Sequence, residues 1–169
     1  MVITDSFWGN IFKGNKKGDE GTKLILKKTP LFEVLSDKEL TVIERILHRR
    51  KYDENEAIFR QGDTGAGMYI IETGNVNISH ELTGRIIVKL GAGEIFGEIS
   101  LINDSPRSAS AYADVRSNIL FFSQADLNNL TDRDPKLGAR IIKRLASILG
   151  HRLVASNEQI GQLKRELNK

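Results

Sequence analysis

Residues 96–113 read FGEISLINDSPRSASAYA, and the interpretation of the whole chain starts from this stretch. Gly97 permits a positive φ or a close backbone approach. We expect one short helical turn over residues 98–102, stopped before Pro106, which cannot continue a helix. A strand over residues 108–113 should follow. Such a turn offers free N–H donors and the positive end of a dipole, an arrangement that suits a small anion.

Two charged side chains in this stretch have different chemical uses. Arg107 carries a planar fork that can grip two phosphate oxygens. Glu98 is out of place beside a phosphate unless it accepts a hydrogen bond from a hydroxyl, such as the 2′-OH of a ribose. One phosphate and one sugar hydroxyl together indicate a cyclic nucleotide. The alternative interpretation is a glycine-bounded turn with an Arg–Glu pair on the surface.

The stretch resembles the phosphate-binding cassette of the cyclic nucleotide-binding domain family. That pattern runs Phe-Gly-Glu-aliphatic-small-Leu-aliphatic, then a few polar residues, then Pro-Arg-(Ser/Thr/Ala)-Ala, and the chain matches it without a gap. The resemblance implies that Glu98 holds the ribose 2′-hydroxyl, that Arg107 pairs with the cyclic phosphate and that the next residue also binds phosphate. The ligand-binding residues that it implies are Gly97, Glu98, Ile99, Arg107, Ser108 and Ala109.

Composition is ordinary for one globular domain: 169 residues, 40% hydrophobic, 28% charged, with a net charge of +3. The absence of cysteine excludes disulfides and thiolate metal sites. No apolar run approaches the roughly 20 residues of a membrane span, and the N-terminus does not read as a signal peptide. We therefore expect a cytoplasmic protein.

The N-terminal part divides into a leader over residues 1–28 and a helical region over 24–47. The leader should be partly helical, with a stripe of apolar side chains, and contain a flexible basic linker over 13–21; the stripe is Phe7, Trp8, Ile11 and Phe12. Its aromatic and lysine residues leave contact with a membrane surface open, although packing on its own domain or a partner is favoured.

A capping box marks the start of the second N-terminal helix. Ser36 is expected as its N-cap, with Glu39 at the third helical position. The basic residues 48–51 are interpreted as the solvated end of this helix, where cations meet the negative end of the dipole.

Short strands separated by turn residues fill residues 52–123. We expect strands at 57–60, 68–72, 76–79, 85–90, 108–113 and 119–122. About seven or eight strands at this spacing favour a sandwich or a barrel. The resemblance sharpens this to an α+β fold: an antiparallel β-roll of jelly-roll topology with about eight strands, in a domain over 29–134, flanked by N-terminal helices and a long C-terminal helix.

The C-terminal part is helical again, with a short helix over 124–130 and a long one that begins at Pro135 with Asp134 as N-cap. The long helix, over 135–169, should carry a coiled-coil seam and form a parallel homodimer. The stripe and seam comprise Ile142, Leu145, Leu149, Leu153, Ser156, Ile160, Leu163 and Leu167.

This helix resembles the dimer helix of the Crp-Fnr type of bacterial regulator. The resemblance implies that two adjacent polar residues, Ser156 and Asn157, touch the adenine, one from each subunit. Asn157 is larger than the family's residue, which leaves the preference between cAMP and cGMP open, with cAMP favoured. Ser156 also suits a role as the polar residue that sets the register of the seam.

The sequence predicts a sensor and no enzyme, cofactor or metal site. The three histidines are scattered, and neither a Walker-type nor a Gly-x-Ser-x-Gly motif occurs. The chain stops at Lys169, so we expect no helix-turn-helix and no direct contact with nucleic acid. Binding should signal through the long helix and its dimer. The alternatives are a ligand-independent interaction module and the sensor half of a transcription regulator.

Overall fold

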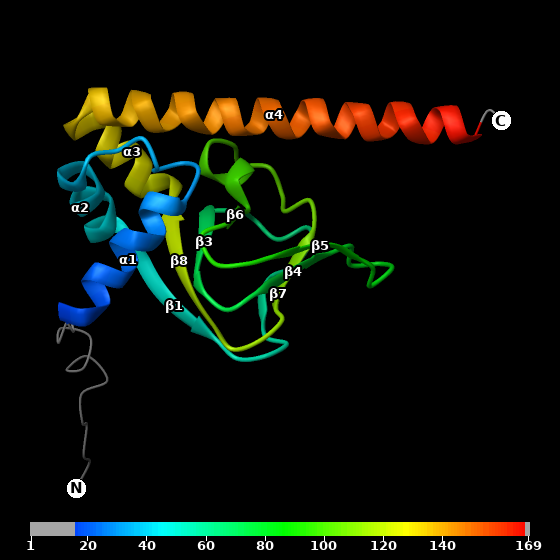
Figure 1. Cartoon of the computed structure of the whole chain (residues 1–169). Coiled ribbons are helices and arrows are strands. Elements are labelled where there is room, and N and C mark those ends of the chain that lie inside the picture. Colours follow the sequence, from blue (N-terminus) through cyan, green and yellow to red (C-terminus); the bar gives the residue numbers. More distant parts are fainter. Residues whose placement is uncertain (1–15, 168–169) are drawn as a thin grey trace, which may run out of the picture.

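The computed structural model describes residues 16–167, with side chains from Gly21 onward (Figure 1). The helices are α1 (Lys16–Lys28), α2 (Asp37–Ile46), the 3-10 helix η1 (Glu98–Leu101), α3 (Gln124–Arg133) and α4 (Pro135–Leu167). The strands are β1 (His48–Tyr52), β2 (Ala57–Phe59), β3 (Gly67–Thr73), β4 (Val76–Ser79), β5 (Ile86–Leu90), β6 (Ile95–Phe96), β7 (Ser110–Ala113) and β8 (Ser117–Ser123).

The eight strands form two four-stranded antiparallel sheets, ordered β1-β8-β3-β6 and β2-β7-β4-β5. The sheets make a β-roll, while α1, α2 and α3 gather at one end of it and α4 crosses it as a long rod (Figure 1). The predicted α+β fold, with an antiparallel β-roll, N-terminal helices and a long C-terminal helix, is therefore confirmed.

Two hydrophobic cores hold these layers together. One joins the helices to the sheet that contains β3 and β8, and it includes Phe32, Phe122 and Leu145. The other fills the space between the two sheets. The segment around η1 belongs to both, since Phe96 lies in the second core and Leu101 in the first. Burial at each end fixes the position of the residues between them.

Residues 48–51 are not a helix end, as the sequence analysis expected, but most of strand β1. This strand pairs along its length with β8, from His48 opposite Phe121 to Tyr52 opposite Ser117. All four basic side chains are exposed, so the segment has no apolar alternation that would reveal a strand. Pairing with a distant strand decides its conformation.

The expected flexible linker over 13–21 is also wrong where the structure describes it. Helix α1 runs through Gly18 and Gly21, and further along it Leu26 is fully buried in the first core. Tertiary burial of this face outweighs the low helix propensity of glycine. The aromatic stripe expected near the N-terminus lies outside the described residues.

Both predicted helix starts are confirmed. The Ser36 hydroxyl caps α2 in a complete capping box with Glu39. At the start of α4 the backbone N–H of Leu137 donates to Asp134 Oδ1 at 3.0 Å. The predicted stripe of α4 needs one correction: Ile141 and Leu145 are fully buried, whereas Ile142 is 41% exposed.

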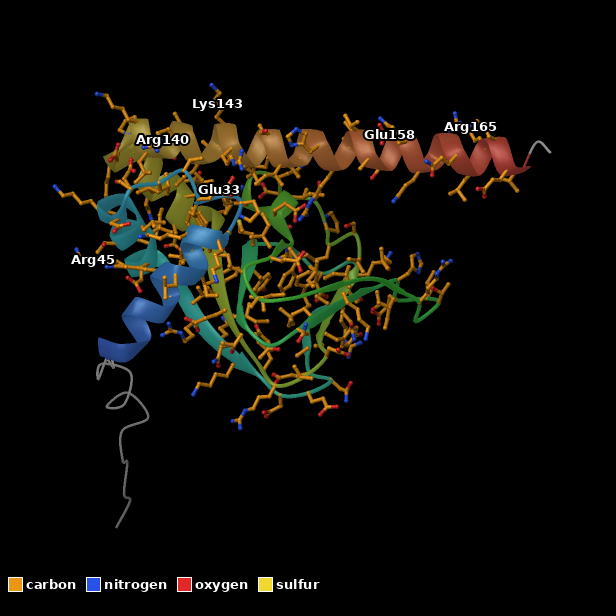
Figure 2. The ribbon with its side chains drawn as sticks, viewed as in Figure 1. Glu33, Arg45, Arg140, Lys143, Glu158 and Arg165 are labelled. Atoms are coloured by element: carbon orange, nitrogen blue, oxygen red, sulfur yellow. The ribbon has the colours of Figure 1, made fainter. Side chains whose placement is uncertain are left out.

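Two arginines fasten the first half of α4 to α2 and to the loop that precedes it. Arg140 pairs with Glu39 of α2, and Arg144 pairs with Glu33 of the loop. Figure 2 labels Arg140 and Glu33, one member of each pair. The Arg144 Nε also donates to the carbonyl of Pro30 at 2.8 Å. None of the helices in the described part of the chain is long and apolar enough to cross a membrane.

Candidate functional site

A cavity of about 670 Å³ lies between the β-roll and α4. The segment from Gly97 to Ser100, residues 105–109 and one face of α4 supply its polar lining. Its apolar lining comes from the β-roll: Phe59, Ile78, Ile87, Val88, Leu90, Ile95 and Phe96. The cavity is therefore amphipathic, with charged groups gathered where η1 meets α4 and Arg107.

Gly97 shapes the entrance to η1. Its φ is 67°, in the left-handed region where residues with a Cβ are strained. A Cβ at this position would lie only 2.6 Å from Nη1 of Arg107. The same Nη1 donates to the Gly97 carbonyl at 2.9 Å. The structure therefore shows at Gly97 both features that the sequence analysis named, a positive φ and a close approach.

Arg107 is a buried cation with spare hydrogen-bonding capacity. Its residue is 6% exposed, and burial lowers the pKa of the guanidinium below its ordinary value. Nη2 donates to the carbonyl of Gly67 at 2.8 Å, and the guanidinium carbon lies 4.3 Å from the ring centre of Phe59. Among the described residues, the buried Nε has no hydrogen-bond partner. A buried cation with an unused donor favours an anion in the cavity.

Glu98 is tied to the long helix. Its Oε1 lies 2.6 Å from Nη1 of Arg152, and Arg152 Nη2 donates to the carbonyl of Ile95 at 3.2 Å. The Glu98 side chain is 8% exposed, so most of this carboxylate is removed from water. The pair connects η1 directly to α4. Any ligand group that bonds to Glu98 would meet Arg152 as a neighbour or as a competitor.

The structure brings together seven of the eight residues expected at the site. Those that line the cavity are Gly97, Glu98, Ile99, Arg107, Ser108, Ala109 and Ser156. Asn157 is not among the lining residues, because one residue along a helix turns the side chain by about 100°. Its expected contact with a base bound to a second protomer stays a prediction.

Sequence reasoning missed three lining residues on α4, namely Arg152, Ala155 and Gln159. Arg152 is 57 positions from its carbonyl partner Ile95, so no local pattern links the two. The sequence did contain one indication of Arg152 and Gln159. They lie four residues before and three residues after Ser156, so they share its face of the helix.

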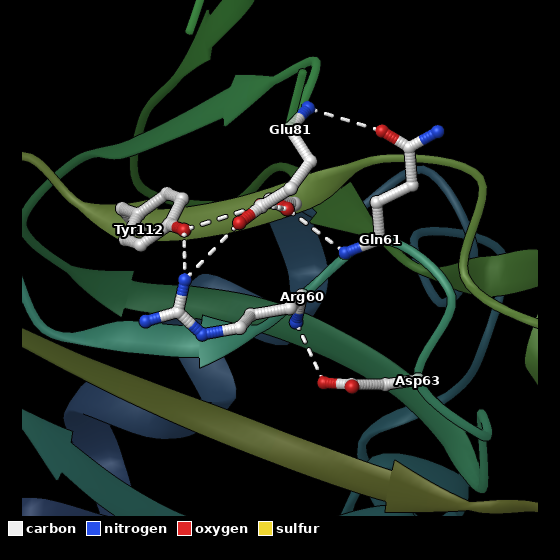
Figure 3. Close-up of polar contacts among 6 residues, drawn as sticks. Arg60, Gln61, Asp63, Glu81 and Tyr112 are labelled. Carbon is white, nitrogen blue, oxygen red and sulfur yellow. Dashed lines mark hydrogen bonds and ion pairs between the residues drawn. The ribbon is translucent and has the colours of Figure 1, made fainter.

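A second polar network lies at the turn between β4 and β5, and β5 carries apolar side chains that line the cavity. Arg60, at the end of β2, donates to Tyr112 Oη at 2.9 Å and pairs with Glu81 at 3.2 Å (Figure 3). Glu81 also accepts a hydrogen bond from Ser110, which holds the pKa of that carboxyl below its ordinary value. The Glu81 N–H donates to Gln61 Oε1 at 3.0 Å. The turn before β5 is thereby fastened to β2 and β7.

Within residues 16–167, no cluster of three or more histidines and carboxylates could hold a metal ion. The polar groups of the cavity are instead suited to hydrogen bonding and ion pairing with an organic anion.

Comparison with known proteins agrees with this geometry. The sequence model of the cyclic nucleotide-binding domain matches residues 49–134. A cyclic AMP receptor protein from Thermus thermophilus is 33% identical over 144 residues, which are 83% of this chain and 65% of that protein. A putative potassium channel protein from Rhodopseudomonas palustris is 34% identical over 119 residues, which are 69% of this chain and 29% of that protein. The chain thus spans less than two thirds of either relative.

Solved structures give the same result. The crystal structure of the Thermus thermophilus catabolite activator protein has a TM-score of 0.72 at 33% identity, over 80% of this chain and 63% of that one. A cyclic nucleotide-binding domain from Methylobacillus flagellatus has a TM-score of 0.74 at 31% identity, over 85% of this chain and 83% of that one. With the matched segment, the β-roll and the cavity in agreement, the chain belongs to the cyclic nucleotide-binding domain family.

Proposed function

We propose that this chain binds cAMP in preference to cGMP and acts as a cytoplasmic sensor, without catalysis of its own. The observation that carries the proposal is Arg107, a buried cation with an unused donor in a cavity of about 670 Å³. The name of the Thermus relative, a cyclic AMP receptor protein, supports cAMP as the ligand.

The residues around the cavity divide the work between the parts of the nucleotide. Arg107 and Ser108 would hold the cyclic phosphate, with backbone groups of Gly97 and Ala109. Glu98 would accept a hydrogen bond from the ribose hydroxyl. Ile99 and the apolar wall would cover the sugar and base, and Ser156 would touch the base. Asn157 would reach the base held by a second protomer.

Signalling would pass through the contact between Glu98 and Arg152. A ribose hydroxyl that bonds to Glu98 would change the ion pair between Glu98 and Arg152. Since Arg152 belongs to α4, this change would favour a different position of the helix. Such a shift requires that the ligand have different affinities for the two helix positions. In this scheme residues 1–28 form a leader, 29–134 the ligand-binding domain and 135–169 the dimerisation helix.

Calorimetric titration with cAMP and then cGMP tests the proposal. We expect micromolar or tighter binding by the wild type. Arg107→Ala should weaken binding by at least about 10-fold, because a hydrogen bond to a charged group contributes roughly 1.5–3 kcal/mol. Arg116→Ala is the matched control, since this arginine is exposed and lies outside the cavity lining. A melting curve of each variant reports whether it is folded.

Wild-type affinity in folded Arg107→Ala would contradict the phosphate assignment. A wild type that binds neither nucleotide would contradict the proposed function. In that case the apolar side chains exposed on α4 would favour the alternative, an interaction module that keeps the β-roll without a ligand.

A further inference from the structure

Phe59 lies against one face of the Arg107 guanidinium. The guanidinium carbon is 4.3 Å from the centre of the Phe59 ring, and both residues line the cavity. A guanidinium is planar, and its five N–H donors point outward in that plane. Two of them bond to the carbonyls of Gly97 and Gly67, whereas Nε has no hydrogen-bond partner among the described residues. Because the ring packs on the face, it leaves the in-plane donors free for an anion.

An irregularity in β2 accompanies this orientation of Phe59. Along a regular strand, successive side chains point to opposite faces of the sheet. Here the register of β2 against β7 shifts between Ala57 and Phe59, as it does at a β-bulge. The two neighbours Ile58 and Phe59 accordingly both pack against the second core. The shift thus allows β2 to bring an aromatic ring beside the residue that is expected to bind phosphate.

Two further aromatic rings hold Phe59 in place. The ring centres of Tyr69 and Phe96 lie 5.5 Å and 5.9 Å from that of Phe59. The rings of Tyr69 and Phe96 also stack on each other, with centres 5.2 Å apart, and both residues are buried. A side chain that is locked by such packing can hold its neighbour in one geometry. The Arg107 guanidinium is therefore fixed by two carbonyls in its plane and by a supported ring on one face.

We propose that Phe59 is a positioning residue for phosphate binding, because it holds the Arg107 guanidinium in one orientation before the ligand arrives. This inference rests on the proposed function. The attraction between a cation and an aromatic face is stronger when both are removed from water, and Arg107 is only 6% exposed. A ligand that meets an arginine already in place does not bear the entropy cost of ordering it. Phe59 thus raises the affinity for the nucleotide through Arg107.

A double-mutant cycle with Arg107 tests this role by calorimetric titration with cAMP. Phe59→Leu keeps an apolar side chain but removes the ring, and it should weaken binding by about 3- to 12-fold, the equivalent of ordering one long side chain. Arg107→Lys keeps a positive charge, so that binding stays measurable, but it has no planar face to stack on a ring. In the Arg107→Lys chain, Phe59→Leu should therefore cost less than half as large a factor. A direct contact between Phe59 and the nucleotide, or a purely structural role, would cost the same factor in both chains.

Phe121→Leu is the matched control. The Phe121 ring also lies against an arginine, with the guanidinium carbon of Arg50 5.0 Å from its centre, and it packs against the same core and on Tyr69. Phe121 is outside the cavity lining, so its replacement should leave the affinity for cAMP within about twofold of the wild type. A melting curve of each variant reports whether it is folded. If Phe59→Leu does not fold, Phe59→Met, which also lacks a ring, takes its place in the cycle.

The outcomes separate this inference from the proposed function. If the factors lost through Phe59→Leu in the two chains differ by more than about twofold, and Phe121→Leu binds as the wild type does, Phe59 positions Arg107. If the two factors agree within about twofold, the inference is overturned and the proposed function stands. A Phe121→Leu variant that loses as much affinity as Phe59→Leu also overturns it, because the effect then belongs to the aromatic cluster as a whole. A wild type that binds neither cAMP nor cGMP overturns the proposed function itself.

Discussion

Arg107 and Glu98 carry opposite charges in one cavity, yet different partners hold them. Arg107 is supported by two backbone carbonyls, those of Gly97 and Gly67, and it forms no ion pair with a described carboxylate. Glu98 has a charged partner in Arg152. An incoming anion therefore gains most at Arg107, whereas a neutral hydroxyl can join Glu98 without a second net charge. This division matches a ligand with one phosphate and one free sugar hydroxyl.

At the same scale, Glu72 gives a prediction about acid stability. Burial alone would raise the pKa of Glu72, but hydrogen bonds from Arg49 and Thr22 outweigh it and hold the pKa below its ordinary value of 4.5. A carboxyl whose pKa is lowered by folding stabilises the fold above its unfolded pKa, and this contribution is lost as the pH falls through the folded pKa. Glu72→Gln should therefore cost stability at pH 7, by about 1 kcal/mol or less. The cost should shrink below pH 4.5.

Urea unfolding of wild type and Glu72→Gln at pH 7 and pH 3 measures this difference. Glu158→Gln, at an exposed position on α4, is the control and should show little change at either pH (Figure 2). An equal loss of stability in Glu72→Gln at both pH values would refute the ionic origin of the effect.

The site residues that could be predicted from the sequence are those that lie close together along the chain. Glu98, Arg107 and their neighbours form one continuous stretch, and its turn residues, Gly97 and Pro106, fix its local shape. Arg152 and Gln159 were not predicted as site residues, because their place at the cavity depends on how α4 packs across the β-roll. A helix pattern shows which residues share a face but not what that face touches.

At the scale of the elements, β1 is a strand that hydrophobic periodicity does not predict. Residues 48–51 are uniformly basic and exposed, so neither the two-residue nor the 3.6-residue period is visible. The strand forms because β8 supplies a partner about seventy residues later in the chain. Charged side chains also suit its place at the edge of a sheet, where they discourage pairing with other chains. The two-residue strand β6 was also not predicted, because it is too short to show a period. The other six strands, which have apolar alternation or turn residues at their ends, were predicted within a few residues.

Helix α4 offers a matched pair of glycines that separates packing from helix propensity. A Cβ on Gly138 would lie 2.8 Å from the Thr131 Cα of α3, whereas a Cβ on Gly150 would meet nothing within 4 Å. Gly138→Ala should therefore destabilise the protein by about 1–3 kcal/mol through overpacking. Gly150→Ala should stabilise it by up to about 1 kcal/mol, because alanine favours a helix more than glycine does.

Thermal unfolding of the two variants beside the wild type measures both effects. A lower melting temperature for Gly138→Ala and an unchanged or higher one for Gly150→Ala are expected. If Gly138→Ala melts at or above the wild-type temperature, α3 and α4 do not need the close approach seen at Thr131.

At the scale of the whole molecule, a single copy of the chain leaves several apolar side chains of α4 exposed to solvent. Leu145 is fully buried, but Leu153, Ile160 and Leu163 are 62%, 50% and 58% exposed. The described part of α4 continues well beyond the β-roll (Figure 1). An exposed apolar stripe on a long helix is typical of a surface that meets a partner helix. The proposed parallel homodimer would cover it.

The triple variant L153S/I160S/L163S tests that dimer. Light scattering coupled to size-exclusion chromatography should show a wild-type dimer and a monomeric variant. The β-roll should keep its melting transition in the variant, because all three side chains are already at least half exposed. A wild type that elutes as a monomer at high concentration would contradict the proposed dimer.

The anchoring of α4 also has a mechanical consequence. The helix is held by the buried Leu145, touches the cavity at Arg152 and ends its described length at Leu167. At about 1.5 Å per residue, these points lie about 10 Å and about 33 Å from Leu145 along a straight rod. The helix is therefore a lever whose long arm is about three times its short arm. A push of about 1 Å at Arg152 carries its far end through about 3 Å.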